Sequence, residues 1–166
     1  MSFCPDGVNG ILHNSNNRII VVRQNYDEFK WMLPGGGVEK ALRETFEEAV
    51  MREILEETGI EVCETNLRHA AELKQRVLNH DTKEIHNGTL RLFAVEGVYS
   101  LDNFEPNTEV SEAAYMTVEE IVARRNEFKI GYVRMVVHYD RYRSGLYTTP
   151  ITGELSEKVE YALVPV

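Results

Sequence analysis

Apolar and polar positions alternate along much of the chain in short stretches that predict strands. Residues 7–24 carry two apolar runs around the polar cluster 14–17, which predicts two strands joined by a turn. The segments 88–99 and 111–117 have a similar strand-like pattern, whereas 67–78 fits either a strand or a helix. The pattern therefore predicts that strands form much of the fold.

A helix is predicted from Thr45 to Thr58, where the apolar residues recur at helical spacing. Thr45 is the expected N-cap, and Glu48, three residues later, completes a capping box. Gly59 follows the last helical residue, at the position where helices commonly end with a left-handed glycine. The sequence thus marks both ends of this helix.

Two more helices and a final strand are predicted in the last third of the chain. Thr117 and Glu120 form a second capping-box pattern that opens a helix through about Asn126, and residues 131–145 have helical spacing. The tail, 155–166, alternates as a strand would, so we expect it to pair with a sheet edge of the same chain or of a second copy in a homodimer. Strands mixed with two or three helices predict a layered α/β or α+β domain.

The 166 residues have the length of one domain, so 1–166 is predicted to be a single unit. The formal charge of −9 argues against nucleic acid as a partner, because no basic stripe is present. The sequence has neither a long apolar span nor a signal-peptide pattern, which argues against a membrane partner and against secretion. Cys4 and Cys63 form no disulfide framework, so a cytoplasmic location is expected.

Three glutamates make the first predicted helix unusual. Glu53 and Glu57 project within roughly 20° of Phe46, inside the apolar stripe, and Glu56 lies at its edge. The ordinary interpretation of such a run is a solvated face with Arg52 as an ion-pair partner. It fits poorly here, because an unpaired carboxylate in an apolar stripe costs several kcal/mol. A divalent cation would offset that cost, since carboxylate oxygens are the ligands that hard cations prefer.

The segment around these glutamates resembles the Nudix box, the signature of the Nudix hydrolase (MutT-like) family. That signature is Gly, five residues, Glu, seven residues, then Arg-Glu-apolar-any-Glu-Glu-any-Gly-apolar. The residues that match it in type and spacing are Glu44, Arg52, Glu53, Ile54, Glu56, Glu57, Gly59 and Ile60. Gly36, the best counterpart of the opening glycine, lies seven residues before Glu44 instead of five, which predicts a loop enlarged by two residues. The box therefore spans about 36–60, and a C-terminal extension covers about 146–166.

This resemblance implies an α/β/α sandwich around a mixed β-sheet. It also implies hydrolysis of a nucleoside diphosphate linked to another moiety, with Mg²⁺ or Mn²⁺ as the cofactor. The expected metal ligands are the carboxylates of Glu53, Glu56 and Glu57, one of which could also activate the water, and the carbonyl of Gly36. Arg52 would orient a glutamate through a fork-like ion pair. The glycines before the helix could instead serve only to turn the chain sharply.

Further candidate site residues lie outside the helix. Glu44 and Trp31 are candidate substrate contacts: Glu44 would contribute to the site or stabilise its loop, and Trp31 could stack on a base or belong to the core. A general base outside the box is expected, because bound cations lower the basicity of the box carboxylates. Family members often bring a catalytic glutamate from the region that holds Glu109 and Glu112. Glu112 is preferred because it adjoins a predicted strand.

Two other functions are compatible with a resemblance to this family. A Nudix-like module that senses a nucleotide without cleaving it usually lacks a box carboxylate, and this sequence keeps all of them. An isomerase of prenyl diphosphates shares the fold, but the box here is nearly complete for hydrolysis. The substrate stays open between nucleoside triphosphates, including oxidised ones, and nucleotide sugars.

Overall fold

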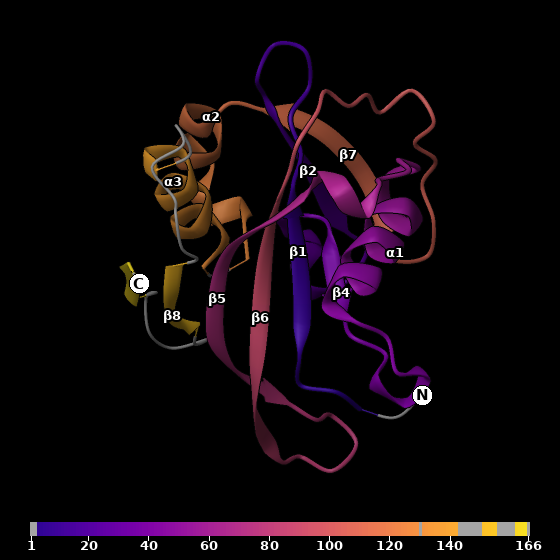
Figure 1. The fold of residues 1–166 in the computed structure, drawn as a ribbon, viewed down its shortest axis with the longest axis vertical. Coiled ribbons are helices and arrows are strands. Elements are labelled where there is room, and N and C mark those ends of the chain that lie inside the picture. The colour runs from indigo at the N-terminus through magenta and orange to yellow at the C-terminus, as the bar shows by residue number, and fades with distance from the viewer. Residues whose placement is uncertain (1–2, 130, 143–150, 156–161, 166) are drawn as a thin grey trace.

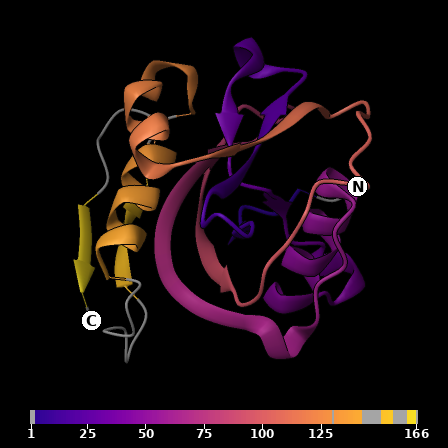
Figure 2. The same cartoon turned by 90° about the horizontal axis from the view of Figure 1, so that it is seen from above.

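The protein is a sandwich of helices on both faces of a mixed sheet. The computed structural model describes residues 3–129, 131–142, 151–155 and 162–165. Helix α1 (Phe46–Thr58) covers one face, and α2 (Val118–Ala123) and α3 (Tyr132–Tyr142) cover the other (Figure 1, Figure 2). The predicted α/β/α arrangement is thereby confirmed. None of the helices in the described part of the chain has the length and apolarity needed to cross a bilayer.

Two sheets make up the strand layer. The larger one contains β1 (Gly7–Ile11), β4 (Gly35–Gly37), β5 (Leu67–Leu78), β6 (Ile85–Val95), β8 (Ile151–Leu155) and β9 (Ala162–Pro165). Its strand order is β4-β1-β6-β5-β8-β9, with β1 parallel to β6 and β5 parallel to β8, and the other pairs antiparallel. The smaller sheet has the order β3-β2-β7 and contains β2 (Ile19–Gln24), β3 (Trp31–Met32) and β7 (Val110–Met116).

Several elements differ in detail from the sequence-based predictions. The turn at 14–17 joins β1 and β2 as predicted, but the two strands enter different sheets. The segment 67–78, which fitted a strand or a helix, is the strand β5, since it pairs along its length with β6. The second predicted helix is shorter than expected, because α2 ends at Ala123 and the chain continues through a 3-10 turn at Arg125–Glu127.

The C-terminal tail pairs with the main sheet within the same chain. β8 lies parallel to β5 in a register that begins with Ala71 opposite Ile151, and β9 lies antiparallel to β8. The pairing predicted for 155–166 is therefore confirmed for its described residues. Val159 and Tyr161, which belong to the predicted segment, lie outside them.

Each helix layer has its own apolar core against the sheet. Fully buried residues between the strands and the α2–α3 layer include Leu73, Ile121 and Val136. Fully or almost fully buried residues between the strands and α1 include Val8, Ala49, Val50, Ile54 and Phe93. Burial of an aliphatic side chain of this size stabilises by roughly 1.5–3 kcal/mol. These contacts fix which face of α1 meets the sheet, and the same helix carries the box glutamates.

Candidate active site

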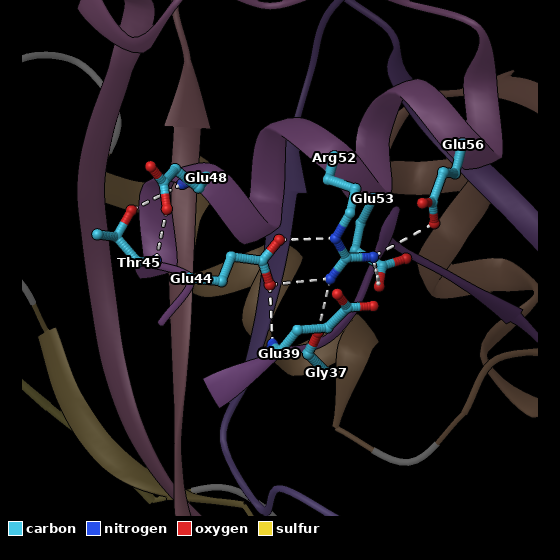
Figure 3. Close-up of polar contacts among 8 residues, drawn as sticks. All are labelled: Gly37, Glu39, Glu44, Thr45, Glu48, Arg52, Glu53 and Glu56. Carbon is cyan, nitrogen blue, oxygen red and sulfur yellow. Dashed lines mark hydrogen bonds and ion pairs between the residues drawn. The ribbon is translucent and has the colours of Figure 1, made fainter. Parts of the chain in front are cut away.

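Helix α1 has a capping residue at each end. The Thr45 hydroxyl accepts a hydrogen bond from the Glu48 N–H at 3.1 Å, and the Glu48 carboxylate accepts one from the Thr45 N–H at 2.9 Å (Figure 3). Gly59 ends the helix with φ of 75° and donates its N–H to the Leu55 carbonyl at 2.9 Å. Both predicted caps are confirmed, and an N-cap of this kind is worth about 1 kcal/mol. The caps fix where the helix starts and stops.

The orientation of α1 against the sheet buries two of the three glutamates that the hydrophobic pattern of the helix made unusual. Glu53 and Glu57 are 7% and 6% exposed, whereas Glu56 is exposed, as their positions relative to the apolar stripe predict. The Gly35 N–H donates to Glu57 Oε1 at 3.4 Å. The buried pair of carboxyl groups therefore faces the glycine strand β4 and not the solvent.

The three glycines form the strand β4 instead of a sharp turn. They pair with β1, with Gly36 opposite Val8. A Cβ atom on Gly36 would lie 2.5 Å from Glu53 Oε1, and one on Gly35 would lie 2.0 Å from the Val8 carbonyl oxygen. Glycine is thus required because the strand approaches both β1 and the buried carboxylates closely. The carbonyl of Gly36 as a cation ligand stays a prediction.

Arg52 links the helix to the segment before it. Its Nε donates to Glu44 at 2.6 Å and its Nη2 donates to the same carboxylate at 3.1 Å, so the pair is bidentate (Figure 3). Its Nη1 donates to Glu53 at 2.8 Å and to Glu56 at 3.3 Å. Its Nη2 also donates to the Gly37 carbonyl at 3.0 Å. A planar fork of five N–H donors suits this arrangement, which lysine cannot reproduce.

The loop between β4 and α1 is held by Glu44. The carboxylate of Glu44 accepts a hydrogen bond from the Glu39 N–H at 2.8 Å in addition to its bonds from Arg52. The Arg52 guanidinium holds the pKa of Glu44 below its usual range. The loop predicted to be enlarged contains a 3-10 turn at Lys40–Leu42, and Lys40 pairs with Asp6. Of the roles predicted for Glu44, the structure supports stabilisation of this loop.

The electrostatic state of Glu57 is unusual. Burial raises the pKa of Glu57 to about 9, and the negative charge of Glu53 adds to the increase. Its Oε2 has no hydrogen-bond partner among the described residues. Burial also raises the pKa of Glu53, although the hydrogen bond from Arg52 opposes that effect. The charge of Glu109 contributes to raising both pKa values.

These carboxyl groups fit a divalent cation by their chemistry. In the described part of the chain, no three Asp, Glu, His or Cys side chains already converge as ligands of one ion. Glu53 and Glu56 are bound to Arg52, while Glu57 has a buried oxygen without a partner. A cation would supply the positive charge that this buried cluster lacks, and it would displace the proton that Glu57 retains at neutral pH.

A family model described as NUDIX domain matches residues 5–136, which include α1, its glutamates and the glycine strand. The chain belongs to the NUDIX family. No curated protein matches this Nudix sequence significantly.

Solved structures share the Nudix fold at low sequence identity. The MutT protein from Methanosarcina mazei Go1 is 22% identical, with a TM-score of 0.67 over 84% of this chain and 94% of that one. The NUDIX domain of Shewanella oneidensis NrtR, complexed with ADP ribose, is 13% identical, with a TM-score of 0.63 over 86% and 90%. An Ap4A hydrolase from C. elegans is 12% identical, with a TM-score of 0.61 over 86% and 99%. At these identities the likeness shows the fold alone.

Trp31, predicted as a substrate contact, lies in the core of this Nudix domain. Trp31 is 4% exposed. The guanidinium groups of Arg124 and Arg23 lie 5.5 and 6.0 Å from its ring centroid. Burial and these cation–π contacts support the core role, one of the two that the sequence left open for Trp31.

The two candidate general bases lie in different environments. Glu112 lies in β7 opposite Arg23, with 3.5 Å between its Oε1 and the Arg23 Nη1, and its side chain is 54% exposed. Glu109 precedes β7, and its charge acts on both Glu53 and Glu57. Of the two, Glu109 is the one whose charge acts on the buried acids, whereas Glu112, which the sequence preferred, pairs with Arg23. The role of general base stays a prediction for both.

The sequence did not predict a buried polar pair that lies beside the Nudix box. Asn9 in β1 is 1% exposed, and its Nδ2 donates to the Leu33 carbonyl at 3.0 Å. The hydroxyl of Tyr132 donates to Asn9 Oδ1 at 3.3 Å. Burial raises the pKa of Tyr132, and the charge of Glu57 adds to that effect. The signal in the sequence for this pair was an asparagine inside an otherwise apolar strand.

In the absence of divalent cations, the free energy of unfolding should fall as the pH rises from about 4.5 to about 9. Folded Glu57 keeps its proton up to a pKa of about 9, whereas its ordinary value is 4.5. The folded chain therefore binds more protons in this window, and the stability that Glu57 contributes below the lower value is lost by up to ~1.4 kcal/mol per pH unit. Urea unfolding in EDTA at about pH 6 and about pH 8 measures this. Glu57→Gln should have a shallower pH dependence, and equal slopes would contradict the assignment.

Proposed function

We propose that this Nudix protein hydrolyses the diphosphate bond of a nucleoside diphosphate linked to another moiety, with Mg²⁺ or Mn²⁺ bound by Glu53, Glu56 and Glu57. The observation that carries the proposal is the state of Glu57, which is buried, has a raised pKa and has an oxygen without a partner. A carboxyl group in this state suits a ligand that releases its proton when a cation binds.

The comparisons support a nucleotide as the substrate class. The Shewanella NUDIX domain was solved with ADP ribose, and the C. elegans protein is an Ap4A hydrolase. Both compounds attach a nucleoside to a second group through phosphates. We therefore propose a nucleoside triphosphate or a nucleotide sugar as the substrate. The free thiols of Cys4 and Cys63 fit the cytoplasmic location that we propose.

Each residue of the site would have its own role in the reaction. Glu53, Glu56 and Glu57 would hold a cation that would supply positive charge to the phosphates and to the leaving group. Water attacks phosphorus, and Glu109 accepts its proton, since the side chain is exposed and lies outside the cation ligands. Arg52 holds Glu53 in position through its hydrogen bond of 2.8 Å, and it ties Glu44 to the helix. Binding and orientation of the diphosphate supply the remaining rate enhancement.

A module that binds a nucleotide without cleaving it is the alternative. The box acids favour the hydrolase, because a binding module has no need for three carboxyl groups beside a phosphate. The discriminating experiment is an activity screen over nucleotides with Mg²⁺ or Mn²⁺, with EDTA controls and product identification. We expect cation-dependent cleavage of a diphosphate bond. Binding of a nucleotide with no product would contradict the hydrolase and support the binding module.

Glu109→Gln should lower kcat by about 100-fold with little change in KM, because it removes the proton acceptor. Glu112→Gln is the matched control: the same chemical change, three positions along, affects a side chain that pairs with Arg23. It should keep kcat close to that of the wild type. Steady-state kinetics of the two variants measure the difference, and the reverse order of effects would restore Glu112 as the base.

A further inference from the structure

The loop between β6 and β7 runs beside the C-terminal end of α1 (Figure 1, Figure 2). The contact is close: a Cβ atom on Gly59 would lie 2.5 Å from the carbonyl oxygen of Asn103. The same loop continues to Glu109, which directly precedes β7. The position of Glu109 relative to α1 therefore depends on what joins this loop to the helix.

Asn107 makes a side-chain bridge between this loop and α1. Its Oδ1 accepts hydrogen bonds from the N–H groups of Glu109 at 2.8 Å and Val110 at 2.9 Å. Its Nδ2 donates to the carbonyl of Glu56 at 3.0 Å. That carbonyl belongs to the last turn of the helix, where carbonyl groups have no partner within the helix. One amide therefore fixes the backbone of Glu109 and joins it to the residue that carries a box carboxylate.

The backbone of Asn107 is anchored as well. Its N–H donates to the Val110 carbonyl at 2.9 Å, and its carbonyl accepts from Asn25 Nδ2 at 2.8 Å. The Asn25 N–H donates to the Glu109 carbonyl at 2.9 Å. Glu109 is thus held through its own N–H by Asn107 and through its carbonyl by Asn25. An exposed loop residue is thereby fixed relative to the helix.

We propose that Asn107 is a positioning residue, which holds Glu109 at the C-terminal end of α1, the part of the helix that carries the box carboxylates, for the hydrolysis. This inference rests on the proposed function. The hydrogen bonds of the Asn107 side chain join backbone groups of Glu56, Glu109 and Val110, so Asn107 acts through the position of Glu109. Its loss would remove the hydrogen bond to Glu56 and free Glu109 to move relative to the helix.

A double-mutant cycle tests this positioning role. Asn107→Ala should lower kcat by between about 10-fold and about 100-fold, with KM within about twofold of the wild type, the scale expected when a reacting group is misplaced by about 1 Å. In the Glu109→Gln background the same change should cause little further loss, because residues that act as a unit have non-additive effects. A purely structural role would give effects that multiply.

Asn79→Ala is the matched control for loss of a turn. Asn79 Oδ1 accepts from the N–H groups of Asp81 at 3.0 Å and Thr82 at 3.4 Å, in the connection between β5 and β6 at the opposite end of the molecule (Figure 1). It should keep the wild-type kcat. Asn107→Asp is a second variant that keeps an acceptor oxygen, replaces the donor to Glu56 with a second acceptor and adds a negative charge. It should lose kcat as Asn107→Ala does.

The results of these experiments distinguish failure of the positioning role of Asn107 from failure of the proposed hydrolysis. Impaired Glu109→Gln together with wild-type kcat in Asn107→Ala and Asn107→Asp overturns the positioning role alone, and so do multiplicative effects in the cycle. Wild-type kcat in Glu109→Gln overturns the role of Glu109 and the inference with it. A wild-type protein that hydrolyses no nucleotide with Mg²⁺ or Mn²⁺ overturns the proposed function itself.

Discussion

Glu57→Gln should lower kcat by about two orders of magnitude or more, because it removes a carboxylate that neutral glutamine cannot replace in holding a cation beside the phosphates. Glu56→Gln should have an effect of similar size. Stability without metal should be unchanged or higher in both variants, because Glu56→Gln removes a negative charge from the cluster and Glu57→Gln removes the cost of keeping a buried carboxyl group protonated at neutral pH. Steady-state kinetics at saturating Mg²⁺ and urea unfolding in EDTA measure the two effects separately.

Glu61→Gln is the control for these two variants. Glu61 is exposed and lies just beyond the end of α1. The same chemical change there should leave kcat at the wild-type value. Turnover near that of the wild type in both Glu56→Gln and Glu57→Gln would show that the box acids are not needed for catalysis.

Arg52→Ala should destabilise the folded protein by about 3 kcal/mol, the scale of removing one partner from a buried ion pair. It would leave Glu44 and Glu53, whose side chains are each 10% exposed, without their principal positive partner. Arg52→Lys should recover only part of the loss, because an ammonium group cannot make the bidentate contact with Glu44. The midpoint of urea unfolding at neutral pH measures the effect.

Arg68→Ala provides the comparison for the arginine variant. Arg68 pairs with Glu96 at the surface, where the two side chains are 69% and 50% exposed. A surface ion pair contributes at most about 1 kcal/mol. If Arg52→Ala lost no more stability than Arg68→Ala, the Arg52 network would be no stronger than a solvated surface pair.

Local signals explain why the sequence predicts α1 and its buried acids so well. The capping residues Thr45, Glu48 and Gly59 act within one turn of the helix ends, so their roles depend on few distant contacts. The position of Glu53 and Glu57 in the apolar stripe follows from helical geometry alone. Burial then follows once the apolar face of the helix meets the sheet.

Long-range packing explains the predictions that differed. Whether the Trp31 ring is exposed or buried depends on contacts with residues far along the chain, such as Arg124. Whether the glycines turn or form a strand depends on their pairing with β1 and on the approach of Glu53. No local pattern contains these contacts, because they depend on how elements far apart in the chain meet.

The choice between Glu109 and Glu112 shows the same limit at the site itself. Proximity to a strand favoured Glu112, but the register of β7 on β2 places it opposite Arg23. Such a register is set by pairing between distant strands, and the sequence of one strand does not specify it. The position of Glu109 depends on Asn107, whose bond to Glu56 spans the loop and the helix.

Calorimetric titration of Mn²⁺ into the metal-free protein, in two buffers of different ionisation enthalpy at about pH 7, tests the central claim most directly. Because Glu57 has a pKa of about 9, it holds its proton at neutral pH until a cation displaces it. The wild-type protein should therefore release about one proton per bound cation. Glu57→Gln should bind Mn²⁺ more weakly and release none. Equal affinity and equal proton release in the two proteins would show that Glu57 is not a ligand of the cation.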